Sequence, residues 1–176
     1  DNGGHLMGLL IDQLTGGYGP IPVLKDVSFT VPRGEIVGLI GLNGAGKSTT
    51  IKHIMGLLQP HSGTIKIDNI TLTQNMEQYR KSMGYIPETP ILYQELTLKE
   101  HIEVTAMAYD LPLDEAMKRA EHLAKLFRLE ERMEWFPAHF SKGMKQKVMI
   151  LCAFLIEAPL YIIDEPFLGL DPLAIH

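Results

Sequence analysis

A glycine-rich stretch in the first third of the chain has the residue types and spacing of a phosphate-binding loop. Residues 41–49 read GLNGAGKST, which fits the pattern G-x-x-x-x-G-K-[ST]. Glycines let backbone N–H groups approach phosphate oxygens, and a helix start adds free N–H groups and partial positive charge. In this pattern Lys47 reaches the β- and γ-phosphates, and the Ser48 hydroxyl is a ligand of Mg²⁺. The predicted nucleotide-binding residues here are Gly41, Asn43, Gly44, Ala45, Gly46, Lys47, Ser48 and Thr49.

A pair of carboxylates follows an apolar run near the end of the chain, in the segment LYIIDEP. We expect Asp164, at the end of a buried strand, to hold the Mg²⁺ directly or through a water. Glu165 can then polarise an attacking water, which makes it the candidate catalytic residue. An apolar strand ending in Asp-Glu is a weak pattern alone, and it gains its meaning from the phosphate loop before it.

The elements that must position these residues alternate between strands and helices. Short apolar runs predict strands at 8–14, 27–31, 35–40, 63–68 and 160–164. The run at 35–40 leads into the phosphate loop, and a helix is predicted from Lys47 to Met55, with Gly56 as its stop. The alternation predicts an α/β fold with a mostly parallel sheet and an inserted helical subdomain at about 89–158.

The helical part carries start signals of its own. Thr97 and Glu100 form a capping-box pair, and Asp114 is the predicted cap of the next helix. A third helix is predicted from Ser141 to Leu155. Its first residues, FSKGM, resemble a second phosphate-recognition loop in which only one glycine is kept. Apolar residues at helical spacing on the first two helices indicate faces that pack into a core rather than ligand sites.

Composition limits the class of protein. The chain has 176 residues, 45% hydrophobic and 21% charged, which suits about one globular domain. A net charge of −5 gives no reason to expect nucleic acid as a partner. A single cysteine, Cys152, excludes an internal disulfide and fits a reducing cytosol. We expect Met7 to be the native start, with residues 1–6 added in expression and left out of the fold.

The order of the motifs resembles that of the ATP-binding-cassette (ABC) ATPases over nearly the whole chain from Met7. The phosphate loop is followed by GYIPE, a helical stretch, FSKGM, the Asp164–Glu165 strand and GLDP at 169–172. The wording of YIPETPILYQELTLKEH, FSKGMKQKVMI and EPFLGLDP is similar to the Ecs-type branch of bacterial transporter ATPases. The resemblance implies a P-loop NTPase core with an N-terminal antiparallel β subdomain and the helical insert, incomplete at the C-terminus.

That resemblance also implies roles for further residues. In the family, two subunits sandwich two ATP molecules head to tail, so Ser141, Lys142, Gly143 and Met144 would face the ATP of the partner. Asp171 would lie in the loop that communicates between the two sites. Tyr18 occupies the place of the aromatic that stacks on adenine; a surface tyrosine in a glycine-rich turn is the alternative. Glu88 stands where the family has a glutamine, and we expect it to contact the metal or water.

The implied function is the ATP-binding and hydrolysing subunit of a transporter, on the cytoplasmic face of the membrane, with an integral permease and a second ATPase subunit as partners. The apolar segment with Ile91, Leu92 and Tyr93 would dock the permease, unless these side chains pack inward. The alternatives are an ABC ATPase acting on ribosomes or DNA, and a nucleotide sensor without turnover. The histidine that contacts the γ-phosphate would lie beyond His176, and His101 and His122 are interpreted as packing or surface residues. We therefore expect residues 1–176 alone to bind nucleotide weakly and hydrolyse it poorly.

Overall fold

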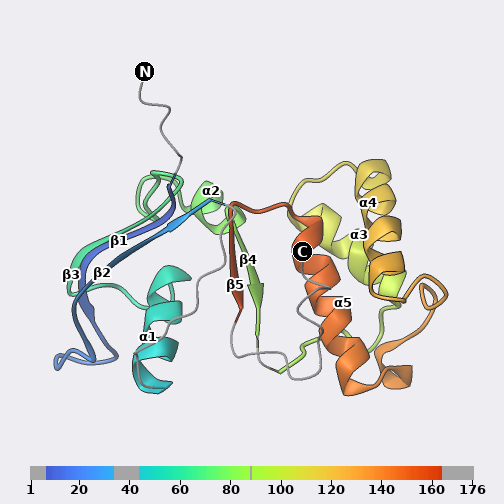
Figure 1. Ribbon diagram of the computed structural model, residues 1–176, viewed down its shortest axis with the longest axis horizontal. Helices are drawn as coiled ribbons and strands as arrows, with labels where there is room; N and C mark the ends of the chain where they lie inside the picture. The colour runs from blue at the N-terminus through green and yellow to red at the C-terminus, as the bar shows by residue number, and fades with distance from the viewer. Residues whose placement is uncertain (1–6, 34–43, 88, 164–176) are drawn as a thin grey trace. The chain divides into compact units, whose positions relative to one another are not determined.

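The computed structural model describes residues 7–33, 44–87 and 89–163, which form two compact units divided after Met83 (Figure 1). The first unit contains β1 (Met7–Gly16), β2 (Leu24–Pro32), α1 (Gly44–Ile54), β3 (Ser62–Ile67) and α2 (Met76–Lys81). The second contains β4 (Met83–Ile86, which begins at the boundary), α3 (Leu98–Ala108), α4 (Leu113–Leu126), the short helix η1 (Pro137–His139), α5 (Lys142–Leu155) and β5 (Leu160–Ile163). The predicted strand at 35–40 lies outside the described residues.

The first unit is built on an antiparallel sheet with the strand order β2-β1-β3, which confirms the expected N-terminal antiparallel β subdomain. Leu9 and Ile11 of β1 are buried, as alternation along a strand requires. The register then shifts at Gln13, whose φ is 50°, so that Leu14 rather than Gln13 faces inward. This bulge keeps one apolar face on a strand whose sequence does not alternate strictly.

Helix α1 begins at Gly44, one turn before the predicted start, so Lys47, Ser48 and Thr49 lie within its first two turns. It ends where the sequence predicts: Gly56 has a φ of 78°, in the left-handed region that favours glycine. The N–H of Gly56 bonds to the His53 carbonyl, and the N–H of Leu57 bonds to the Lys52 carbonyl. This pair of bonds is the Schellman arrangement, which satisfies carbonyls at a helix end.

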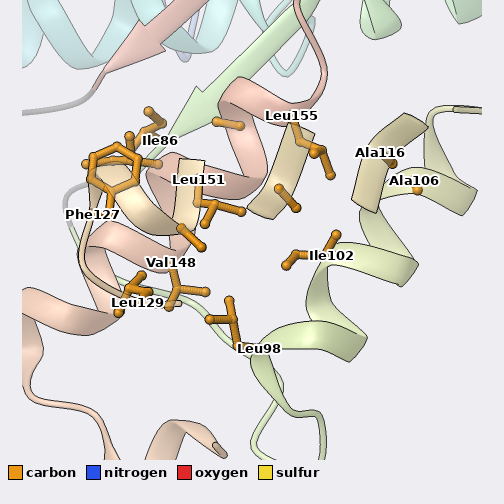
Figure 2. Close-up of a cluster of buried hydrophobic side chains, with 14 of the residues drawn as sticks. Ile86, Leu98, Ile102, Ala106, Ala116, Phe127, Leu129, Val148, Leu151 and Leu155 are labelled. Carbon is orange, nitrogen blue, oxygen red and sulfur yellow. The ribbon is translucent and has the colours of Figure 1, made fainter. Parts of the chain in front are cut away.

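The second unit has a core formed by α3, α4 and α5, whose buried side chains point toward one another in Figure 2. Leu98, Ile102, Leu151 and Leu155 are fully buried there. The face of α4 that meets them is made of small residues, Ala116, Ala120 and Ala124. Such small side chains let neighbouring helices approach closely, so the predicted apolar stripes do form a core.

One prediction about these elements needs correction, one is confirmed, and two elements were not predicted. Asp114 does not cap α4: the N-cap is Pro112, which makes no side-chain cap bond, and Asp114 lies in the first turn. Helix α2 and strand β4 were not predicted, because neither has a long apolar period. The Thr97 capping box is present as predicted, with both reciprocal hydrogen bonds formed.

Candidate functional site

The start of α1 carries the described part of the phosphate-loop motif. Ser48 is exposed and Lys47 is half-buried, whereas Thr49 is buried. The first turn contains no acidic side chain, so nothing there neutralises the positive end of the helix. Farther along, Thr50 donates to the Gly46 carbonyl at 2.7 Å. Gly41 and Asn43 lie outside the described residues, and of Gly44 and Ala45 only the helical backbone is described.

Tyr18 lies in the loop between β1 and β2, with a side chain that is 61% exposed. Its hydroxyl oxygen accepts a hydrogen bond of 2.6 Å from Nζ of Lys52, on α1. That bond is the largest of the causes that lower the pKa of the Tyr18 phenol, and the Ser48 and Thr49 hydroxyls act in the same direction. The structure therefore brings Tyr18 to the helix that carries Lys47 and Ser48, as the nucleotide-site hypothesis requires.

The sequence did not indicate Lys52 as part of this site. Its only signal was a basic residue in the last turn of a helix, which ordinarily complements the helix dipole. The contact with Tyr18 joins residues 34 positions apart in the chain. Local patterning does not report contacts of that kind.

In the second unit, the segment FSKGM forms the start of α5. Ser141 is the N-cap, and its hydroxyl oxygen accepts a hydrogen bond of 3.1 Å from the N–H of Met144. Ser141, Lys142 and Gly143 are exposed, and no neighbouring atom lies within 4 Å of the position a Cβ would take at Gly143. Met144 is partly buried and packs against the core, which explains an apolar residue there. The first turn thus offers a cationic, unobstructed surface.

The predicted carboxylates lie outside the described residues. Glu88, Asp164, Glu165 and Asp171 are all among them, and no cluster of metal-ligating side chains is found in the ranges that the structure does describe. The strands before two of them are described: β4 and β5 pair side by side and run in the same direction (Figure 1). Carboxyl ends of parallel strands meet at one edge of a sheet, which is the usual place for ligand-binding residues in α/β proteins.

The segment predicted to dock a partner contains both exposed side chains and one that packs inward. Ile91 and Tyr93 are 75% and 63% exposed, whereas Leu92 packs against the core. Two backbone hydrogen bonds hold the segment: the Ile91 N–H donates to Sδ of Met149 at 3.2 Å, and the Tyr93 N–H donates to Nε2 of His101 at 2.9 Å. His101 is buried, so it is a packing residue, as the sequence indicated, and His122 is exposed.

Among the described residues, no helix is long and apolar enough to cross a bilayer. The starts of α1 and α5 both combine free N–H groups with a lysine side chain and no acidic side chain in the first turn, which suits them to bind an anion.

Comparison with known proteins agrees with this geometry. The family model described as "ABC transporter" matches residues 24–168. The chain is 64% identical over 168 residues to the "ABC-type transporter ATP-binding protein EcsA" of Bacillus subtilis, covering 96% of the chain and 68% of that protein. It is 40% identical to the "SkfA peptide export ATP-binding protein SkfE" of the same organism, covering 84% of the chain and 61% of that protein.

Two solved structures are similar to the chain. One, described as the ATP binding subunit of an ABC transporter, has 63% identity and a TM-score of 0.87, covering 96% of this chain and 70% of that one. The other is cbiO1 from Clostridium perfringens, described as part of the ABC transporter complex cbiONQ. It has 29% identity and a TM-score of 0.81, and the match covers 96% of this chain and 69% of that one. The predicted fold class is confirmed by these matches.

Proposed function

The chain belongs to the ABC transporter family of ATP-binding proteins, which are ATPases, and on that premise we propose how its residues bind and use ATP. The motif order predicted an ABC ATPase subunit of a transporter, and the wording of three segments predicted the Ecs-type branch. The family match and the 64% identity to EcsA confirm these predictions. The named relatives are transporter proteins, which favours this function over action on ribosomes or DNA. The observation that carries the proposal is the contact of Tyr18 with α1, the helix whose first two turns contain Lys47 and Ser48.

ATP would lie along α1, with its phosphates at the helix start and its base against Tyr18. Lys47 and the free N–H groups of the first turn supply positive charge to the phosphates. The exposed ring of Tyr18 offers a face to adenine, and stacking of this kind contributes roughly 1–3 kcal/mol by analogy with nucleic-acid bases. The residues present fit the nucleotide, because this end of α1 has no acidic side chain to repel it.

Mg²⁺ fits the same place through the exposed hydroxyl of Ser48, with Asp164 and Glu88 as the proposed carboxylate ligands. When bound, the ion would neutralise charge on the phosphate oxygens during transfer. Glu165 is proposed to orient and polarise the attacking water. Support comes from β4 and β5, which are neighbouring strands. Glu88 and Asp164 follow the ends of these strands closely in the sequence.

The start of α5 is proposed to bind the γ-phosphate of an ATP held by a second ATPase subunit, identical or not. Ser141, Lys142 and Gly143 are all exposed, so no movement within the unit is needed to present them. The helix dipole and the Lys142 ammonium both favour an anion here. Asp171 would then communicate between the two sites. ATP binding would close such a dimer and hydrolysis would reopen it.

The closing motion is proposed to drive an integral membrane permease, with the chain on the cytoplasmic face of the membrane. The docking surface would include the exposed side chains of Ile91 and Tyr93. The backbone N–H groups of these two residues donate hydrogen bonds to side chains of α5 and α3, so a force on this segment would reach both helices. No nucleic acid is expected as a partner, since the chain has a net charge of −5.

Affinity capture from detergent-solubilised membranes tests the proposed partner. The full-length protein should recover an integral membrane protein, and Ile91→Glu should weaken that recovery because a charge would enter an apolar contact. Met107→Glu is the matched control, since Met107 is also 75% exposed but lies near the end of α3. Recovery of ribosomes, or equal loss with both variants, would contradict the proposal.

A further inference from the structure

Lys52 and Tyr18 form a direct side-chain contact between α1 and the loop that follows β1, within the described part of the first unit. The hydrogen bond between Nζ and the phenol oxygen is 2.6 Å long. A loop with two glycines and a mostly exposed tyrosine leaves the ring free to rotate unless something fixes it. Helix α1 is the rigid element that lies against this loop, and Lys52 makes the strongest of its contacts with the Tyr18 hydroxyl.

The position of Lys52 on α1 matters as much as its charge. Ser48 and Lys52 are four residues apart, so both lie on the same face of the helix. The face that presents Ser48 toward the phosphate end therefore also presents Lys52 toward Tyr18. A single helix face thereby fixes the distance between the proposed phosphate site and the proposed base site.

The contact leaves the faces of the ring open. Nζ of Lys52 lies 4.9 Å from the ring centroid but only 2.6 Å from the hydroxyl oxygen. The ammonium therefore sits at the hydroxyl end of the ring rather than over its centre. A cation placed over the face would compete with a base for the same surface, whereas one at the hydroxyl does not.

We propose that Lys52 is a positioning residue for the nucleotide base: it holds Tyr18 by its hydroxyl so that a ring face is presented to the adenine of ATP. This rests on the proposed function, in which Tyr18 stacks on adenine. Lys52 then lowers the ordering cost of stacking, because the ring is fixed before ATP arrives. Lys52 lies in the last turn of α1, at the opposite end of the helix from the proposed phosphate site, so its effect should be confined to ligands that carry a base.

The test measures binding of ATP and of inorganic tripolyphosphate to the full-length protein by calorimetry. Lys52→Met keeps the apolar stem and removes the donor, while Tyr18→Phe keeps the ring and removes the acceptor. Each should weaken ATP binding about fivefold, with tripolyphosphate unchanged, and the double variant should lose no more than either single one. Lys52→Arg should keep affinity within about twofold, because it can still donate.

Lys25→Met is the matched control, since Lys25 is an exposed lysine of β2 whose loss changes net charge equally. It should leave both affinities unchanged. In turnover assays Lys52→Met should raise KM for ATP and leave kcat unchanged, which a loss of folding would not do.

Tyr18→Ala separates failure of the inference from failure of the proposed function. If Tyr18→Ala weakens ATP binding but Lys52→Met does not, the role of Lys52 is overturned while stacking on Tyr18 stands. If Tyr18→Ala leaves ATP affinity unchanged, both the stacking and the role of Lys52 are overturned. If Lys52→Met weakens ATP and tripolyphosphate equally, Lys52 acts on phosphate and is not a positioning residue for the base.

Discussion

Substituting Gly143 by alanine should leave the fold intact and still prevent the protein from associating around ATP. No atom lies within 4 Å of the position that the added methyl group would take. Gly143 is also in the first turn of α5, where alanine is intrinsically better than glycine by roughly 0.5–1 kcal/mol. The free energy of unfolding should therefore stay the same or rise, with Tm higher by up to about 4 °C for a chain of this size.

The added methyl group should weaken dimerisation instead, because a second subunit would bring its nucleotide against the start of α5. A methyl group forced into a closely packed contact costs typically 1–3 kcal/mol. A head-to-tail dimer contains this contact twice, so the dimerisation constant should fall by a factor between about 30 and about 25,000. The assay is light scattering of the full-length protein with ATP, in a Glu165→Gln background that is expected to hold the dimer together.

Gly84→Ala is the contrasting control in the same unit. Its Cβ would lie 2.7 Å from Cδ1 of Tyr161, whose ring packs edge-on against Phe154. This variant should be destabilised by about 1–3 kcal/mol because the ring must move. If Gly143→Ala associates with ATP as strongly as the parent protein, the start of α5 does not lie against a partner's nucleotide and that part of the reasoning is refuted.

Further predictions concern three single sites, Gly63, Cys152 and Lys142. Gly63→Ala should destabilise the first unit by more than about 1 kcal/mol in urea unfolding, because Gly63 has a φ of 93° and an added Cβ would collide with the Gln13 carbonyl oxygen. An unchanged midpoint of unfolding would contradict this. Burial raises the pKa of Cys152 to about 11 from an ordinary value of 9.0. Alkylation of this thiol at pH 8 should therefore be about a hundredfold slower in the folded protein than in denaturant. Equal rates would show that the thiol is accessible. The same raised pKa means that this group's contribution to stability is complete below pH 9 and is lost as pH rises toward 11. Lys142→Gly should weaken ATP-dependent association at low salt and have little effect at high salt, because salt screens the charge that is lost. If association is unchanged at both salt concentrations, the Lys142 charge has no role in it.

Much of the fold could be predicted because the signals were local. The Thr97 box depends on residues three positions apart and formed as expected, and Ser141 caps the helix that was predicted to begin there. Asp114 failed as a cap because Pro112 already starts the helix, with a φ suited to a first turn. Helix α2 was missed because its one buried apolar residue, Tyr79, is held by a distant contact in which its hydroxyl donates to the Ile54 carbonyl.

The site was predictable where a motif fixes spacing and not where two segments must meet. The phosphate-loop pattern placed Lys47 and Ser48 at a helix start from the sequence alone. The role of Met144 could not be predicted from the sequence, since only the folded unit shows that its side chain packs against the core. Lys52 was missed for the same reason, because its partner Tyr18 comes from another segment of the chain.

The most direct test of the central claim is the behaviour of Glu165→Gln in the full-length protein. With ATP and Mg²⁺ it should bind two nucleotides per dimer, double its mass in light scattering and show no turnover. With ADP it should remain monomeric, because the γ-phosphate that joins the two subunits is missing. Hydrolysis at the wild-type rate, or a monomer at saturating ATP, would contradict the account.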